Sequence, residues 1–448
     1  MACSATGANR DIAYVPETVF KTTPANPMFK TLRTTGDSLK GTTEAQESSE
    51  LRKGRSTSAP VRGRSSAAGD IPFEFSYRSF RDLLAALMSN DWEDDNSAGA
   101  VAGQKILTLG QVSKSFTFER FFSDIILYRY YRGVMVGGFN LSVPLDGKVT
   151  GSFNLLGVNN PPALTAPVTG ATYDPETPHT TDQFTSYIGS LRVQRKAQNI
   201  LTTGATVTGA VSIPVVALTG DIAAGTVIPF GAVNVTTGLA AHAGDTALTV
   251  VATTEDIASG VTGVCTYPDQ DVGFATQVDI AVSNNMKQDY ALFRTEAYCI
   301  SPDKFGVTGT LGVYLTDGTF INTYVNWETM KLVFEVTDVS GNKYRFTLPT
   351  IKMTDAPDGV SNGSTLTISF PFTAFGDNCL TIQEIPGTAE NRVLAPIMSI
   401  AGPTVTVRAH TEEVAPLPAG YSIRFTIDGV EPTLTTGTEV TLTAGSGT

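Results

Sequence analysis

The stretch Lys148-Val149-Thr150-Gly151-Ser152-Phe153-Asn154-Leu155 decides the fold, because a close copy of it, Gly306-Val307-Thr308-Gly309-Thr310-Leu311-Gly312-Val313, occurs later in the chain. In both copies apolar residues alternate with Thr or Ser around a shared Val-Thr-Gly, which is typical of a β-strand with one buried face. The copies predict that a β-domain has been duplicated. Repeats of this kind favour an architecture assembled from like units over one built around a single reactive pocket.

Composition indicates a folded, mainly β protein. The chain has 448 residues, of which 41% are hydrophobic, and a net charge of −12 at pH 7. Thr and Gly are abundant and few segments carry a helical period, so we expect many short strands in several domains. No apolar run is long enough to span a membrane and the start lacks an export signal, so no membrane is expected. The acidic balance argues against a basic surface that binds phosphate.

Residues 36–69 read as a long loop with an acidic half and a basic half, because no aromatic residue lies between Phe29 and Phe73. The charged residues of this predicted loop are Asp37, Lys40, Glu44, Glu47, Glu50, Arg52, Lys53, Arg55, Arg62 and Arg64. Two interpretations stay open, a solvated tether and an interaction arm. The length and the divided charge suit docking onto another copy of the same chain.

One helix and two hairpins stand out. Residues 77–89 carry a helical stripe with Ser76 placed to cap its start. The stripe consists of Phe80, Leu83, Leu84, Leu87 and Met88. We expect this helix to cover one face of a sheet. Asp146-Gly147 marks a tight turn, and residues 332–348 alternate around Ser340-Gly341-Asn342 as a β-hairpin does.

Changes in residue composition and internal repeats divide the chain into four parts. Residues 1–190 form a first repeat, whose residues 1–27 read as an arm that orders only against another surface. A small β-module is inserted at 201–263, where residues 212–228 resemble residues 247–263. Residues 191–200 and 264–390 form the second repeat. Residues 391–448 are predicted to be an Ig-like β appendage, although they are short for a full domain of that kind.

No pattern carries convincing chemistry. Residues 359–363 match G-x-S-x-G, but strand-forming residues rather than a helix follow them. His179, His242 and His410 lie in contexts typical of surface residues, and the cysteines lack metal-ligand spacing. We therefore expect no catalytic, cofactor-binding or metal site, and a structural protein rather than an enzyme.

Residues 28–157 and 273–385 resemble the major tail tube proteins of long-tailed bacteriophages. In the first half the likeness lies in a strand, the charged loop, the covering helix and the strand Gly137-Gly138-Phe139-Asn140-Leu141 before the Val-Thr-Gly strand. In the second half it lies in Gly341-Asn342-Lys343-Tyr344, Leu348-Pro349 and Thr354-Asp355-Ala356. The resemblance implies duplicated tail-tube β-sandwich or barrel domains with a covering helix, beside the inserted and C-terminal β-modules.

The resemblance also implies a function: a structural virion protein that polymerises into stacked rings, forming the hollow tube that delivers the genome. Single-domain members form rings of six, so two domains per chain imply a homotrimeric ring with pseudo-sixfold symmetry, with a homohexamer as the alternative. The implied partners are other copies of the chain, the tape measure, tail terminator and tail tip proteins, and double-stranded DNA in transit without specific binding. Assembly is expected in the host cytoplasm and residence in the virion tail.

Two groups of residues receive roles from this implication. The charged loop at 36–69 would reach the next ring, and Asp146, Asp279 and Asp317 would face the bore, where negative charge lets DNA slide. Because the added modules would decorate the outside, a non-contractile tail without a sheath is expected. The alternative is a β-rich phage adhesin or receptor-binding protein, which predicts exposed aromatic platforms in modules that hold neither Trp92 nor Trp327.

Overall fold

The computed structural model describes residues 6–7, 9–50, 58–97, 99–174, 182–195, 198–218, 222, 224–265, 270–315, 318–356, 366–387, 397–401, 404–408 and 439–443. The chain splits into two compact units, residues 1–338 with 342–386, and residues 339–341 with 387–448. In the second unit the described residues form three antiparallel strands, β27 (Ile397–Ala401), β28 (Thr404–Arg408) and β29 (Glu439–Thr443). The Ig-like prediction for residues 391–448 falls mostly outside the described residues.

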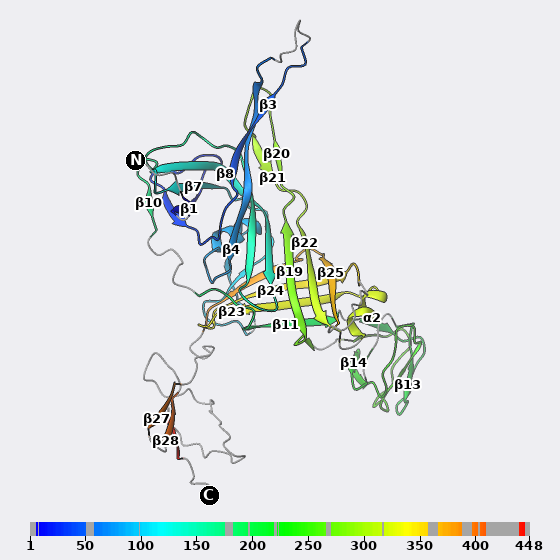
Figure 1. The fold of residues 1–448 in the computed structure, drawn as a ribbon. Coiled ribbons are helices and arrows are strands. Elements are labelled where there is room, and N and C mark those ends of the chain that lie inside the picture. Colours follow the sequence, from blue (N-terminus) through cyan, green and yellow to red (C-terminus); the bar gives the residue numbers. More distant parts are fainter. Residues whose placement is uncertain are drawn as a thin grey trace. The chain divides into compact units, whose positions relative to one another are not determined.

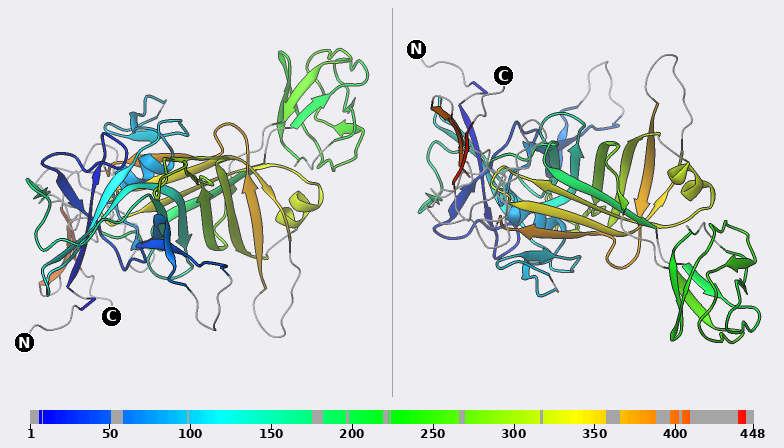
Figure 2. Two further views of the ribbon diagram at one scale, coloured as in Figure 1. Left: turned by 90° about the horizontal axis from the view of Figure 1, so that it is seen from above. Right: turned by 90° about the horizontal axis from the view of Figure 1, so that it is seen from below.

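The first unit contains a continuous antiparallel run of strands in the order β3–β4–β9–β8–β19–β22–β25–β24 (Figure 1). These strands are β3 (Lys40–Gln46), β4 (Val61–Glu74), β9 (Thr150–Gly157), β8 (Leu127–Val143), β19 (Ala275–Ser283), β22 (Gly306–Tyr314), β25 (Thr367–Ala374) and β24 (Lys343–Met353). The first four belong to the N-terminal half and the last four to the second half. Figure 2 shows the cyan strands of one half beside the green strands of the other. We call this run the main sheet.

The two halves repeat the same elements in the same order. In the first half β1 (Arg10–Pro16) pairs with β7 (Phe116–Phe122), which pairs with β8. In the second half β11 (Gly189–Arg195) pairs with β23 (Met330–Thr337), which pairs with β24. Both pairings shift register at the same place, between Phe116 and Phe118 and between Met330 and Leu332. A helix comes before β7 in the first half, α1 (Arg81–Leu87), and another comes before β23 in the second half, α2 (Thr319–Val325). The predicted duplication is confirmed.

The predicted equivalence of the two Val-Thr-Gly copies is wrong. The second copy lies in β22, which precedes α2 and so takes the place of β4, whereas the first copy lies in β9. The copies share an environment instead of a position. A Cβ atom on Gly151 would lie 2.7 Å from the Phe73 ring, and one on Gly309 would lie 2.4 Å from the Phe372 ring. Each glycine makes room for an aromatic ring from the adjoining strand.

The sequence predicted a long irregular loop at residues 36–69, and this prediction is wrong. β3 and β4 pair from Lys40↔Ala68 to Gln46↔Val61 and build a hairpin, so only residues 47–60 connect the strands. Of that connection, residues 51–57 lie outside the described part. The small residues Ser65 and Ala67 on one face of β4 are buried, which a search for large apolar residues overlooks.

From residue 9 onward the N-terminal segment packs within the chain, contrary to the prediction of an arm that orders only against another surface. β1 pairs with β7 along its whole length, from Arg10↔Phe122 to Pro16↔Phe116, and its residues from Ile12 to Val15 are buried. The next strand, β2 (Met28–Thr31), pairs with β1 and with β10 (Thr172–Tyr173).

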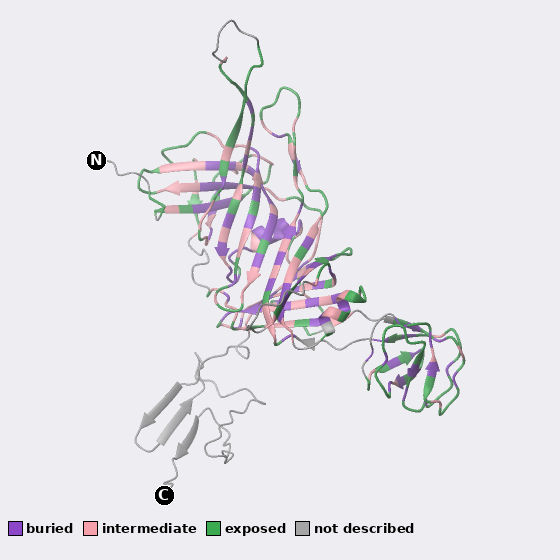
Figure 3. Cartoon of the chain, turned by 45° about the vertical axis from the view of Figure 1, so that its right-hand side comes forward, coloured by how far each residue is buried: buried purple, intermediate pink, exposed green. Residues whose placement is uncertain are grey.

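The apolar face of the main sheet is closed by α1 and by a second set of strands. α1 is shorter than the predicted helix at 77–89, and Ser76 does not cap it, because its Oγ bonds to Ser79 Oγ at 2.5 Å. The predicted stripe is buried along its whole length. The second set pairs in the order β18–β11–β23–β24–β26–β6–β5 and confirms the hairpin predicted at 332–348. Its further strands are β18 (Gln270–Asp271), β26 (Thr381–Ile385), β6 (Lys105–Leu107) and β5 (Glu93–Asp94). Figure 3 shows the alternating burial along the strands.

The inserted segment has a hydrophobic cluster of its own, which includes Ile213, Ile228 and Leu248. Its strands are β12 (Gln198–Leu201), β13 (Ser212–Pro214), β14 (Val227–Phe230), β15 (Val233–Thr236), β16 (Ala247–Thr249) and β17 (Thr262–Cys265). The two similar stretches pair with each other through β13 and β16, and their matching glycines, Gly225 and Gly260, have φ angles of 81° and 79°.

Candidate functional site: the polar face of the main sheet

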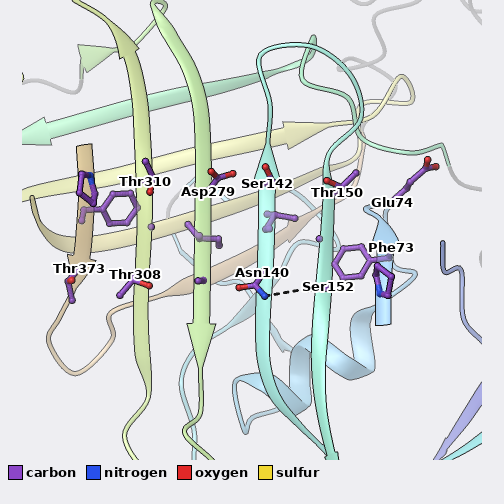
Figure 4. A pocket seen from close by; sticks show the side chains of 18 of the residues that line it. Phe73, Glu74, Asn140, Ser142, Thr150, Ser152, Asp279, Thr308, Thr310 and Thr373 are labelled. Carbon is purple, nitrogen blue, oxygen red and sulfur yellow. Dashed lines mark hydrogen bonds between the residues drawn. The ribbon is translucent and has the colours of Figure 1, made fainter. Parts of the chain in front are cut away.

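One face of the main sheet carries polar side chains on the neighbouring strands β4, β9, β8, β19, β22 and β25 (Figure 4). We call this set the polar face. It consists of Glu74 on β4, Thr150 and Ser152 on β9, Asn140 and Ser142 on β8, Asp279 on β19, Thr308 and Thr310 on β22, and Thr373 on β25. Strand alternation sends the residues between them, such as Phe139, Phe153 and Phe370, into the core on the other side. The residues of the polar face line an open hollow of about 900 Å³.

The polar face is held by contacts between neighbouring strands. Asn140 Nδ2 donates to Ser152 Oγ at 3.3 Å, and Lys148 Nζ pairs with Glu74 Oε2 at 2.7 Å. Gln277 donates to Asp279 Oδ2, while Asp279 Oδ1 has no hydrogen-bond partner within the described structure. Among the described residues that line the hollow, two are acidic and none is basic. The surface can therefore present hydroxyls and negative charge, without a phosphate-binding cluster.

The two halves join on this face through backbone pairing of β8 with β19, from Val278↔Val143 to Ser283↔Gly138. Asn284 extends the junction, since its backbone N donates to Gly137 O at 2.8 Å and its Nδ2 donates to Val136 O at 3.0 Å. In the described pairings β3, at one end of the main sheet, pairs with β4 alone. At the other end, β24 pairs with β25 from Ile351 to Met353, and its described pairing with β23 does not extend past Ile351. The main sheet does not close into a barrel within one chain, so both ends are open edges.

The residues predicted for an inter-ring loop are spread along the β3–β4 hairpin. Lys40, Glu44, Glu47, Glu50, Arg62 and Arg64 are exposed. Arg64 lies 4.4 Å from the centre of the Tyr290 ring. Asp37 differs, because its buried carboxylate is ion-paired with Arg10 at 2.8 Å and with Arg120. Arg52, Lys53 and Arg55 lie outside the described residues.

Of the three aspartates predicted to face the bore, the structure describes two, and they lie in different places. Asp279 lies on the polar face. Asp146 lies in the turn between β8 and β9, where it accepts a hydrogen bond from the Tyr187 hydroxyl. Asp317 is outside the described residues. Sequence reasoning missed Glu74, which shares the polar face with Asp279, although its alternation with Phe73 and Phe75 could have shown it.

The other chemical motifs of the sequence add no site. The G-x-S-x-G stretch, His179 and His410 lie outside the described residues, and His242 is exposed in the inserted segment. Within the described ranges no group of three His, Cys, Asp or Glu residues is placed to hold a metal ion. In the same ranges, none of the helices has the length and hydropathy required to cross a bilayer.

Comparison with known proteins gives one family. The model of the phage tail tube protein family matches the chain twice, over residues 7–210 and 180–374. The matches begin shortly before β1 and β11, and the second ends with the last residue of β25, so each spans one structural repeat. No curated protein matches the sequence.

Proposed function

Since the chain belongs to the phage tail tube protein family, we propose that its copies join edge to edge into rings, that the rings stack into a tube, and that the polar face lines the bore through which the genome passes. Among the described residues, the polar face is rich in hydroxyl groups, which suits the inner wall of a tube. The finer steps follow from the edges of the main sheet.

The observation that carries the proposal is the β8–β19 junction inside the chain. β19 is the second half's counterpart of β3, and β24 is the counterpart of β8. The two open edges of the main sheet are therefore copies of two strands that already pair with each other. A second chain offering β3 to the open edge after β24 would repeat that pairing, and a ring closed in this way has no edges left.

The counterparts also give the register between chains. Gly41 pairs with Ala67 as Val282 pairs with Val307, and Met353 pairs with Phe372 as Val136 pairs with Leu155. Transferring the β8–β19 register places Lys40-Gly41-Thr42 of one copy against Thr354-Asp355-Ala356 of the next. Because each chain supplies two four-stranded units, a ring of three chains has pseudo-sixfold symmetry, and the homohexamer is the alternative.

In such a ring Asp279 and Glu74 face the bore, and the net charge of −12 adds to a wall that repels DNA phosphates. DNA would then pass without binding. We further propose that the charged β3–β4 hairpin reaches an adjacent ring. The inserted segment and residues 391–448 would lie outside the tube of a non-contractile tail assembled in the host cytoplasm. The tape measure, tail terminator and tail tip proteins complete this proposal as partners.

Negative-stain microscopy of the concentrated protein, together with native mass spectrometry of its rings, tests the proposal. We expect hollow rods and rings of three chains. Gly41→Pro removes one edge N–H and should abolish rings. Because a Cβ atom at this position would also lie 2.4 Å from Asn160 Cβ, Gly41→Ala, which adds that atom but keeps the N–H, is the control that should stay folded and still form rings. Monomers that bind glycans and never form rods would refute the proposal and favour the adhesin.

A further inference from the structure

We propose that the tip of the β20–β21 hairpin is a plug that inserts into the far end of a second copy of this chain in the next ring. β20 (Lys287–Asp289) and β21 (Cys299–Ser301) pair in the connection between β19 and β22. The tip between them exposes Leu292 by 85%, Phe293 by 104% and Tyr298 by 63%. We call these three residues the apolar tip.

The apolar tip stands on a fixed base. Ala297 and Ile300 are buried against Met135 and Val158, while Lys21 Nζ donates to Ala297 O at 3.0 Å. The neighbouring hairpin adds a backbone bond of 2.7 Å from Ser65 N to Thr295 O. A tip held this way loses little freedom on docking, which favours association.

The backbone at the tip is strained as well. Phe293 has a φ of 62°, in the left-handed region that bulky residues avoid. The ring nevertheless has full solvent exposure, so no contact with the described part of the chain compensates for either the strain or the exposure. Strain retained at an exposed aromatic residue points to a contact made outside the chain.

A receptor for the tip lies at the other end of the same strand. The hollow there has a volume of about 360 Å³. Its apolar lining includes Val143, Leu145, Ile188, Leu191, Val278 and Val336. We call it the end hollow. The first residues of β19, from Ala275 to Val278, line the end hollow. The β20–β21 hairpin follows the last residue of β19, Ser283 (Figure 1).

The surface beside the end hollow fits the tip in polarity and in charge. Leu145 is 57% exposed and the adjacent Tyr187 is 71% exposed, so the apolar surface continues outside the hollow. Asp146 lies beside Leu145, and the apolar tip has the exposed cation Arg294 beside Phe293. Docking would bury both apolar surfaces and bring Arg294 near Asp146.

The occupant is a second copy because plug and receptor lie on one chain, at opposite ends of one strand. Contacts between unlike ends do not close, and they propagate as a filament. This inference rests on the proposed function, but it concerns the contact between rings and not the contact within them.

The test compares the double variant Leu292→Ser, Phe293→Ser with Leu239→Ser, which removes a side chain that is 63% exposed in the inserted segment. We expect the double variant to keep its rings, as counted by native mass spectrometry, and to lose rods at least about tenfold in sedimentation. The Leu239→Ser control should form rods as the parent does, and circular dichroism should show all the variants folded. Unchanged rods, or the loss of rings, would overturn the inference.

A charge exchange tests the receptor separately. Arg294→Glu should weaken rods, and Asp146→Arg in the same chain should restore them, because each docked pair then has opposite charges again. Failure of the second change to restore rods would refute the assignment of the end hollow. If the parent chain forms neither rings nor rods, the proposed function fails first, and that outcome is distinct from rings that do not stack.

Discussion

The two halves of the main sheet share a topology but differ in the hairpins that join their first two strands. In the first half the β3–β4 hairpin is long and its exposed residues include the charged residues Lys40, Glu44, Glu47, Glu50, Arg62 and Arg64. In the second half the connection between β19 and β22 carries a short hairpin with an apolar tip. In the proposed tube, the first half would therefore make polar contacts and the second half apolar contacts. Both halves kept the strands that form a common sheet.

The largest effect should come from the core that both halves use. Phe153 pairs with Ile71 as Phe370 pairs with Leu311, and both phenylalanines are fully buried. Phe153→Ala and Phe370→Ala should each lower the free energy of unfolding by about 3–5 kcal/mol. Because β8 and β19 join the halves, we expect one cooperative transition of the two halves in urea for each variant, followed by the fluorescence of Trp92 in the first half and Trp327 in the second, since the inserted segment and residues 391–448 contain no tryptophan. Two separate transitions would show that the halves are independent domains.

The next prediction contrasts two buried carboxylates that each face two arginines. Asp37 lies between Arg10 and Arg120, whose side chains are only 24% and 13% exposed. Glu384 pairs with Arg78 at 2.8 Å and Arg81 at 3.5 Å, which are 48% and 34% exposed.

Asp37→Ala should cost about 3–5 kcal/mol, because it leaves two largely buried guanidinium groups without a carboxylate to balance their charge. Glu384→Ala should cost about 1–3 kcal/mol, because its arginines can turn to water. Urea unfolding of both monomers gives the comparison. An equal cost would mean that the exposure of the arginines does not govern the loss.

A smaller effect is that the two hairpins should contribute to rod formation with different dependences on salt concentration. Changing Glu44, Glu47 and Glu50 to Gln should reduce rods less than about fivefold, because exposed ion pairs contribute little. The reduction should disappear at about 0.5 M salt, where exposed charges are screened. Loss of the apolar tip should reduce rods at every salt concentration. Sedimentation at low and high salt measures both, and a salt-independent effect of the glutamate changes would contradict the assignment of polar contacts to the β3–β4 hairpin.

The sequence predicted correctly the elements that are marked by a periodic pattern of large apolar residues. It failed where the buried residues are small or where pairing with distant strands decides the structure. The stripe from Phe80 to Met88 and the hairpin around Gly341 were found because large apolar residues mark their buried sides. The β3–β4 hairpin was missed, because its buried residues are Ser65 and Ala67 and its stability comes from pairing with neighbouring strands.

The candidate site shows the same division. Asp279 was assigned to the bore through the family resemblance, and it lies on the polar face. The junction of β8 with β19 was not predictable, because sequence gives the faces of a strand but not its neighbour. The repeat of Val-Thr-Gly indicated duplication through a shared local need, a glycine beside an aromatic ring, and so it misplaced the second copy in the topology.

The smallest effect concerns carboxylates on the equivalent strands β7 and β23, which should give opposite pH dependences. Burial raises the pKa of Glu119, and hydrogen bonds from Tyr130 and Tyr173 only partly offset it. Burial alone would also raise the pKa of Glu335, but Arg345 and Lys343 outweigh it and lower that pKa. Stability from Glu119 is thus lost as pH rises above the ordinary glutamate value of 4.5. Stability from Glu335 is lost as pH falls below 4.5.

Glu119→Gln should therefore gain stability relative to the parent chain as pH rises through that window, because the variant has no carboxylate to ionise in the buried site. Glu335→Gln should be less stable than the parent above pH 4.5, and the difference should vanish on acidification, when the parent's carboxylate is protonated too. Urea midpoints of both variants between about pH 3.5 and 6.5 measure the slopes, with Glu47→Gln as a control for one lost exposed charge. Parallel slopes for the two variants would show that the environments of β7 and β23 are alike, and that the halves diverge only at their hairpins.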